Sequence, residues 1–120
     1  MIDKIAYIWV PTTDMDRAVA FYKDVLGFKL LFKREDWSEF EIGGQRLALC
    51  KVDTLHPSKT SPGVSFMAQP IEQVIDTLSG KGVTFIEELK VYPYGKLIHF
   101  QDPDDNILGF YEPPPGNNAS

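Results

Sequence analysis

The sequence predicts an α+β fold in which two tandem βαβββ modules form curved mixed sheets around a concave cavity, with the helices on the outer face. The first observation is an internal repeat, because strand, helix, glycine and three strands occur twice, each time in about 55 residues. The second is that each helical stretch carries one apolar stripe and is too short to be stable without a sheet to cover it. The third is that a glycine, Gly27 or Gly82, follows each helix at the same point of the repeat. We therefore expect one domain over residues 1–120, made of modules at about 1–53 and 62–112.

The strands are predicted from alternating apolar and polar residues. Residues 5–10 form the first, and their alternation places Tyr7 and Trp9 on one face. Gly43-Gly44 is expected to join two later strands as a tight hairpin. The remaining strands are expected over residues 28–34, 37–42, 45–52, 63–68, 83–89, 96–101 and 106–112.

Two amphipathic helices are predicted, one in each module. The first runs from Asp14 to Gly27, with Thr13 and Asp16 as its capping box. The second covers residues 70–79, with proline at or near its first position. A polar linker is expected over 53–62 and a disordered tail over 113–120. Residues 92–95 are expected to form a loop over the cavity mouth, in which Tyr92 or Tyr94 acts as a lid or is only a turn residue.

Composition and charge limit the possible partners and the compartment. The net charge of −5 and the pI near 4.9 argue against binding to nucleic acid or to an anionic membrane surface. No apolar run reaches the roughly 20 residues that a bilayer requires. The first residues lack the pattern of a signal peptide, and the single cysteine, Cys50, fits a reducing compartment. We therefore expect a cytoplasmic protein.

Two motifs carry a resemblance to a known family. The stretch from Tyr7 to Leu30 contains Asp14, a Phe-Tyr pair and a Leu-Gly exit, and it resembles the first βαβ segment of the vicinal oxygen chelate superfamily. That superfamily includes glyoxalases, bleomycin resistance proteins and extradiol dioxygenases. The turn at 101–106 resembles its Asp-Pro-Asp-Gly-Asn signature, with Asp105 where glycine is usual. The resemblance covers about residues 4–112 and implies a homodimer, as do the sheet edges that the fold leaves unpaired.

The resemblance also implies where a divalent metal would be held. Enzymes of the superfamily place His, Gln and Glu ligands at four positions on the concave face. In this chain those positions are Tyr7, Ala48, Gly63 and Gly109. Catalytic metal sites need about three protein ligands, and neither alanine nor glycine has a side-chain donor. We therefore expect no metal and no other cofactor.

The registers of two predicted hairpins indicate which side chains line the cavity. Opposed residues share a face, so Glu39 should lie opposite Ala48 and His99 opposite Gly109, and a slip of one residue would reverse this assignment. The lining predicted on this basis is Tyr7, Trp9, Trp37, Glu39, Ala48, Cys50, Ser65, Met67, His99, Gly109 and Tyr111.

This lining favours a metal-free small-molecule binding protein of the bleomycin-resistance type. Aromatic side chains would stack on a flat ligand, while Glu39 and His99 would orient it, with the acid favouring a cationic ligand. His99 could instead be a general acid or base, and Cys50 a nucleophile or an inert buried thiol. The alternatives are a metal-dependent lyase, isomerase or dioxygenase with a site rebuilt from Tyr7, Glu39 and His99, a metal-independent enzyme, or a partner domain with no ligand. The aromatic residues could also fill the cavity simply as core.

Overall fold

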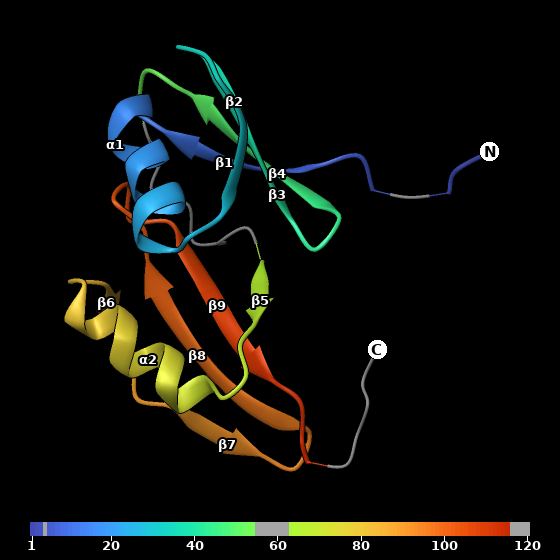
Figure 1. Cartoon of the computed structure of the whole chain (residues 1–120), viewed down its shortest axis with the longest axis vertical. Coiled ribbons are helices and arrows are strands. Elements are labelled where there is room, and N and C mark those ends of the chain that lie inside the picture. The colour runs from blue at the N-terminus through green and yellow to red at the C-terminus, as the bar shows by residue number, and fades with distance from the viewer. Residues whose placement is uncertain (4, 55–62, 116–120) are drawn as a thin grey trace. The chain divides into compact units, whose positions relative to one another are not determined.

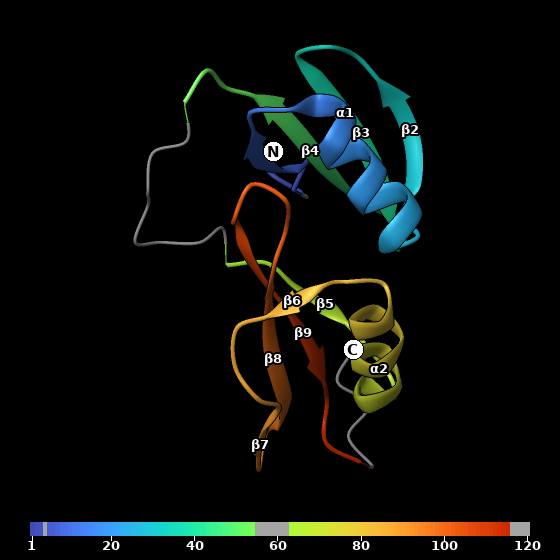
Figure 2. The same ribbon diagram turned by 90° about the vertical axis from the view of Figure 1, so that its left-hand side faces the viewer.

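The chain divides into two compact units, Met1–Lys59 and Thr60–Ser120. The computed structural model describes residues 1–3, 5–54 and 63–115. Each unit contains one mixed β-sheet with a helical segment on one face (Figures 1 and 2). This confirms the predicted α+β fold class. The division falls inside the predicted linker at 53–62, of which residues 55–62 lie outside the described part.

The sheet of the first unit has the strand order β1-β4-β3-β2. Strand β1 pairs with β4 in parallel, and the other neighbours are antiparallel. Gly43 and Gly44 join β3 to β4 with φ values of 55° and 85°, the left-handed conformation that a two-residue hairpin turn requires, so the predicted hairpin is confirmed. The strands are β1 (Ile8–Thr12), β2 (Lys29–Lys33), β3 (Trp37–Ile42) and β4 (Gln45–Lys51).

Strand β1 begins three residues later than predicted and continues through Pro11 to Thr12. Pro11 has no N–H to donate, but it is tolerated because β1 is an edge strand of this sheet. The predicted alternation is confirmed, because Val10 is fully buried whereas Trp9 is half exposed.

The first helix begins one residue later than predicted and changes its geometry midway. Asp14, not Thr13, is the N-cap, and its carboxylate accepts the N–H of Arg17 at 3.1 Å. The segment is an α-helix, α1, over Met15–Ala20 and a π-helix, η1, over Phe21–Val25. Gly27, with a φ of 79°, ends it as predicted.

The helical segment covers one face of its sheet and encloses an aromatic core. The ring of Tyr22 is fully buried between those of Phe21, Phe28 and Phe40, at centroid distances of 5.3 to 6.1 Å. The large apolar strand residues buried on this face are Val10, Phe40, Leu47 and Leu49, which alternate with the residues of the opposite face.

The second unit has the strand order β5-β9-β8-β6, with β7 also paired to β8. Its helix α2 (Ile71–Gly80) is one residue offset from the prediction, with Pro70 as the N-cap. Within the described residues, no helix combines the length and the apolarity that a membrane span requires. The strands are β5 (Ser65–Met67), β6 (Thr84–Phe85), β7 (Lys90–Tyr92), β8 (Gly95–Gln101) and β9 (Ile107–Glu112).

The long strand predicted over residues 83–89 is wrong, because β6 contains only two residues. The Glu87 carboxylate accepts the main-chain N–H of His99 at 2.9 Å, so a side chain takes the place of the next ladder bond. The chain then forms a second short strand, β7, and returns through the turn between Tyr92 and Gly95. Residues 92–95 are therefore a tight hairpin rather than an open loop.

Packing on the helix side of this sheet is also aromatic. Four phenylalanine rings pack together, with centroids of neighbouring rings 4.6 to 6.5 Å apart: those of Phe66, Phe85, Phe100 and Phe110. The shortest of these distances, 4.6 Å, is between the stacked rings of Phe100 and Phe110. The disordered tail was predicted to begin at Pro113, but Pro113 is buried and so does not belong to such a tail. Residues 116–120 lie outside the described part.

Candidate functional site

The predicted register of the first unit is confirmed. Glu39 lies opposite Ala48, which is also paired with Trp9, and Trp37 lies opposite Cys50. These residues occupy the sheet face that the helix does not cover, because the alternate residues of the same strands form the buried core. Ala48 is nevertheless fully buried.

Three aromatic side chains dominate this open face. Tyr7 meets Trp37 edge to face at 5.2 Å between ring centroids. The side chains of Tyr7 and Trp9 are 46% and 50% exposed, so they do not belong to the packed core of this unit. Large exposed rings of this kind are suited to stack on a planar molecule.

Glu39 is buried beneath these rings and is held by two donors. Trp37 Nε1 donates to one carboxylate oxygen at 2.7 Å, and Arg46 Nη1 donates to the other at 2.9 Å. The hydrogen bond from Trp37, followed by the hydrogen bond and charge of Arg46, lowers the pKa of the Glu39 carboxyl below its ordinary value. Sequence reasoning missed Arg46, although it lies in β4 directly opposite Glu41 and so diagonal to Glu39.

Cys50 is partly exposed, and its thiol lies 3.9 Å from the main-chain oxygen of Lys51. The thiol is a weak donor to this carbonyl, and a carbonyl oxygen is not the base that a nucleophilic thiol requires.

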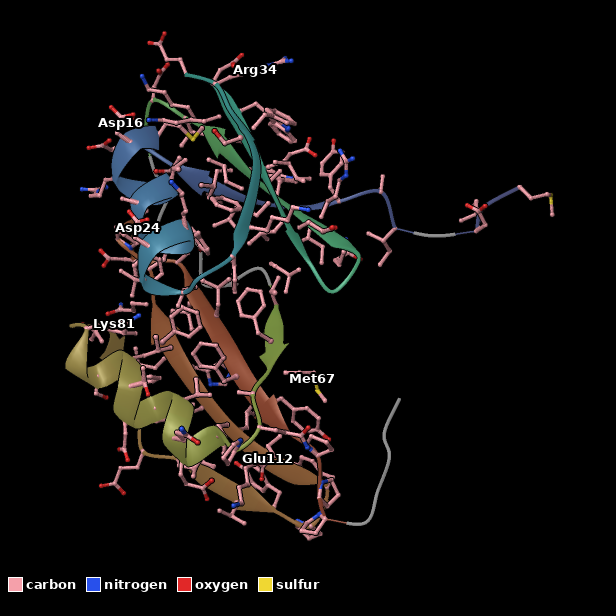
Figure 3. The ribbon with its side chains drawn as sticks, viewed as in Figure 1. Asp16, Asp24, Arg34, Met67, Lys81 and Glu112 are labelled. Atoms are coloured by element: carbon pink, nitrogen blue, oxygen red, sulfur yellow. The ribbon has the colours of Figure 1, made fainter. Side chains whose placement is uncertain are left out.

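The register of the second unit is also as predicted. His99 lies opposite Gly109, which is paired with Ser65, and Met67 is paired with Tyr111. Met67 is 60% exposed, and Figure 3 shows its side chain directed away from α2. These residues therefore share the open face of their own sheet.

His99 is held by a residue that sequence reasoning did not identify. Nδ1 of His99 lies 2.7 Å from Glu87 Oε1, the same oxygen that accepts the main-chain N–H of His99. A carboxylate at Nδ1 selects the tautomer in which that nitrogen carries the proton. The sequence gives no signal for this contact, because Glu87 lies outside the two hairpins whose registers could be predicted.

Tyr111 is fixed by the β7–β8 hairpin. Its hydroxyl donates to the main-chain oxygen of Tyr94 at 2.8 Å, and the Tyr94 ring stacks on that of Tyr92 at 4.9 Å. Gly95 permits this arrangement, because an added Cβ would lie 2.6 Å from the Tyr111 ring. These tyrosines form a rigid aromatic group at one end of the sheet.

A polar groove of about 560 Å³ lies in the first unit, near the start of α1 and the end of β2. Asp16 and Lys33, which line it, form an ion pair, and the hydrogen bond from Lys33 lowers the pKa of Asp16. Figure 3 shows Arg34 and Asp16 at this end of the unit. Its acids and bases are mixed, so its charge indicates no particular ligand.

The match to known proteins extends over most of the chain. Residues 4–110 match the family described as the Glyoxalase/Bleomycin resistance protein/Dioxygenase superfamily. The chain belongs to this superfamily. It is similar to the metallothiol transferase FosB of Shouchella clausii, with 29% identity over 115 residues, 90% of this chain and 79% of the relative.

Solved structures of the superfamily share the fold. A putative glyoxalase family protein from Bacillus anthracis has a TM-score of 0.81 and 21% identity, covering 95% of this chain and 98% of its own. TnmS3, an antibiotic binding protein from Streptomyces sp. CB03234, has a TM-score of 0.77 and 25% identity, covering 94% and 98%.

The four positions where the superfamily resemblance implies metal ligands do not fit a metal in this chain. Ala48 and the two glycines have no donor, and Gly63 has a φ of 72°, a conformation in which a side chain would be strained. A Cβ at Gly109 would lie 2.6 Å from Ser65 Oγ. Among residues 1–3, 5–54 and 63–115, no three His, Cys, Asp or Glu side chains come together as a metal site.

Proposed function

We propose that this superfamily member is a metal-free small-molecule binding protein of the bleomycin-resistance type. The observation that carries the proposal is that Ala48, Gly63 and Gly109 have no side-chain donor, while the half-exposed rings of Tyr7 and Trp9 share an open sheet face with Glu39, which two donors hold. The residues proposed to contact ligand on the open face of the first sheet are Tyr7, Trp9, Trp37, Glu39 and Cys50. Those on the open face of the second sheet are Ser65, Met67, His99 and Tyr111. The similarity to TnmS3, named as an antibiotic binding protein, supports it.

The contacts of Glu39 favour an aromatic ligand over a purely cationic one. A carboxylate that already accepts from Trp37 and pairs with Arg46 has much of its charge compensated within the protein. The rings of Tyr7 and Trp9 are about half exposed and so accessible to a ligand, and stacking on them should supply most of the affinity.

The test combines metal analysis with a binding measurement on the purified full chain. We expect no stoichiometric divalent ion, and we expect planar aromatic compounds to quench the tryptophan fluorescence of the metal-free protein. Trp9→Ala should weaken binding by about tenfold or more, because it removes one stacking partner. The matched control is Val91→Ala, an exposed apolar position outside the predicted lining, which should bind as the wild type does.

The similarity to FosB, named as a metallothiol transferase, is the reason to test a metal-dependent enzyme as a second candidate. In that candidate a metal-dependent lyase, isomerase or dioxygenase uses a site rebuilt from Tyr7, Glu39 and His99. A stoichiometric metal whose removal by a chelator abolishes ligand binding or turnover would refute the metal-free binder and support this enzyme.

We also propose that the protein is a cytoplasmic homodimer. Apolar side chains of the first unit, Ile2 and Ile5, are 101% and 65% exposed, and β1 leaves one edge of its sheet unpaired. A second copy could cover both features. Light scattering should give twice the chain mass, and a monomer at all concentrations would contradict this part of the proposal.

A further inference from the structure

Glu87 holds His99 through a single oxygen. Oε1 accepts the main-chain N–H of His99 at 2.9 Å and lies 2.7 Å from Nδ1 of the same residue. The main chain reinforces this placement, because Ile86 N–H donates to the carbonyl of His99 at 3.1 Å. Two bonds to one residue fix both the position of the carboxylate and the plane of the imidazole ring.

The consequence is a defined hydrogen-bonding pattern at the other ring nitrogen. With the proton on Nδ1, Nε2 of the neutral ring is an acceptor. Among the residues that the structure describes, Nε2 has no hydrogen-bond partner, and the side chain is 38% exposed. The carboxylate at Nδ1 increases the electron density of the ring, which makes Nε2 a stronger acceptor.

A second polar group lies next to this ring. The point where Gly109 would carry a Cβ is 3.3 Å from His99 Cδ2 and 2.6 Å from Ser65 Oγ, so there is no room for a side chain at residue 109. The His99 ring and the Ser65 hydroxyl therefore lie close together over the backbone of Gly109. The next pair along the same strands, Met67 and Tyr111, offers a thioether and an aromatic ring on the same face.

We propose that His99 and Ser65 bind the hydroxyl of a hydroxyaryl ligand, with Glu87 as the residue that positions His99. The phenolic hydroxyl donates to Nε2 of His99, and its oxygen accepts from the Ser65 hydroxyl. A phenol suits this pair because it is a strong donor that also accepts, and its ring can lie against Met67 and Tyr111. This inference rests on the proposed function and names the ligand class of that site.

The experiment compares 2-naphthol with 2-methoxynaphthalene, which has the same rings but no donor. Both are titrated into the ¹⁵N-histidine-labelled, metal-free full chain, and the His99 signals are assigned with the variant His99→Gln. We expect 2-naphthol to bind about tenfold more tightly, the effect of one good hydrogen bond, and to shift the Nε2 resonance of His99. Before addition of ligand, the spectrum should show the proton on Nδ1.

Variants at Glu87 separate positioning from general stability. Glu87→Ala should move the proton toward Nε2 and reduce the preference for 2-naphthol to less than about threefold, whereas Glu87→Gln, which keeps an acceptor, should restore most of it. The matched control is Glu88→Ala, which removes an exposed neighbouring carboxylate and should change neither the tautomer nor the preference.

Equal binding of the two compounds would overturn the inference and leave the proposed binding function standing. If neither compound binds, both proposals are refuted for this ligand class. A tightly bound metal together with an intact preference that depends on His99 and Glu87 would refute the metal-free function and support the inference.

Discussion

Glu112, the last residue of β9, caps a helix that begins 41 residues earlier in the chain. Its Oε1 accepts the N–H of Ile71, the first residue of α2, at 2.9 Å. Pro70, the N-cap by position, makes no side-chain cap. The other carboxylate oxygen lies 3.6 Å from Lys96 Nζ (Figure 3 labels Glu112 at the start of α2). The variant Glu112→Ala removes both contacts.

The expected loss follows from the contacts that the carboxylate makes. A side-chain cap stabilises by about 1 kcal/mol, and a negative charge at a helix N-terminus adds about 0.3–1 kcal/mol. The ion pair with Lys96, in which the side chains of Lys96 and Glu112 are 27% and 14% exposed, adds a smaller contribution. We expect Glu112→Ala to lower the free energy of unfolding by about 2 kcal/mol. Glu112→Gln should cost about half as much, because its amide oxygen can still accept from Ile71.

Urea unfolding followed by far-ultraviolet circular dichroism measures these losses. The matched control is Glu72→Ala, because Glu72 also pairs with Lys96 and lies in the first turn of α2, but it is exposed and does not accept the N–H of Ile71. Its cost should be clearly smaller than that of Glu112→Ala. If Glu112→Ala and Glu72→Ala destabilise equally, the Glu112 cap contributes nothing and the reasoning is wrong.

Three further changes test separate features of the chain. Asp105 has a φ of 63° in an exposed turn, so Asp105→Gly should raise the free energy of unfolding by about 0.5–1 kcal/mol, as measured by urea unfolding. Gly95 has a φ of 137° and no room for a Cβ, so Gly95→Ala should lower the free energy of unfolding by at least about 2 kcal/mol, which a lower melting temperature would show. Glu39 has a lowered folded-state pKa, so it stabilises the fold above its ordinary value near 4.5, and this contribution is lost as the pH falls through the folded pKa. Glu39→Gln should therefore flatten the acid limb of the stability curve, measured by unfolding from neutral pH to about pH 3.

Each of these three predictions has a result that would contradict it. A less stable Asp105→Gly variant would mean that the aspartate stabilises the turn by more than the strain it carries. A Gly95→Ala variant with wild-type stability would show that the hairpin relaxes without cost. An acid limb as steep in Glu39→Gln as in the wild type would assign the pH dependence to other carboxylates.

The hairpin registers could be predicted because local turns determine them. Two glycines in the left-handed conformation leave one alignment for β3 and β4, which places Glu39 opposite Ala48. The β8–β9 turn is equally local, since Asp102 accepts the N–H groups of Asp104 and Asn106 within five residues. From these turns the sequence determines which side chains share each open face.

The sequence by itself thus determined the repeat, the fold class, the strand pairing across both hairpins and the faces on which the candidate site residues lie. The tertiary structure alone decided how those residues are held: Glu87 against His99, Arg46 beside Glu39, and Glu112 at the start of α2. The physical reason is the separation along the chain between the residues that interact. A turn acts on adjacent residues and can be read from their types, whereas a long side chain reaches any group that the folded strands bring within about 3 Å, and no periodicity in the sequence records that distance.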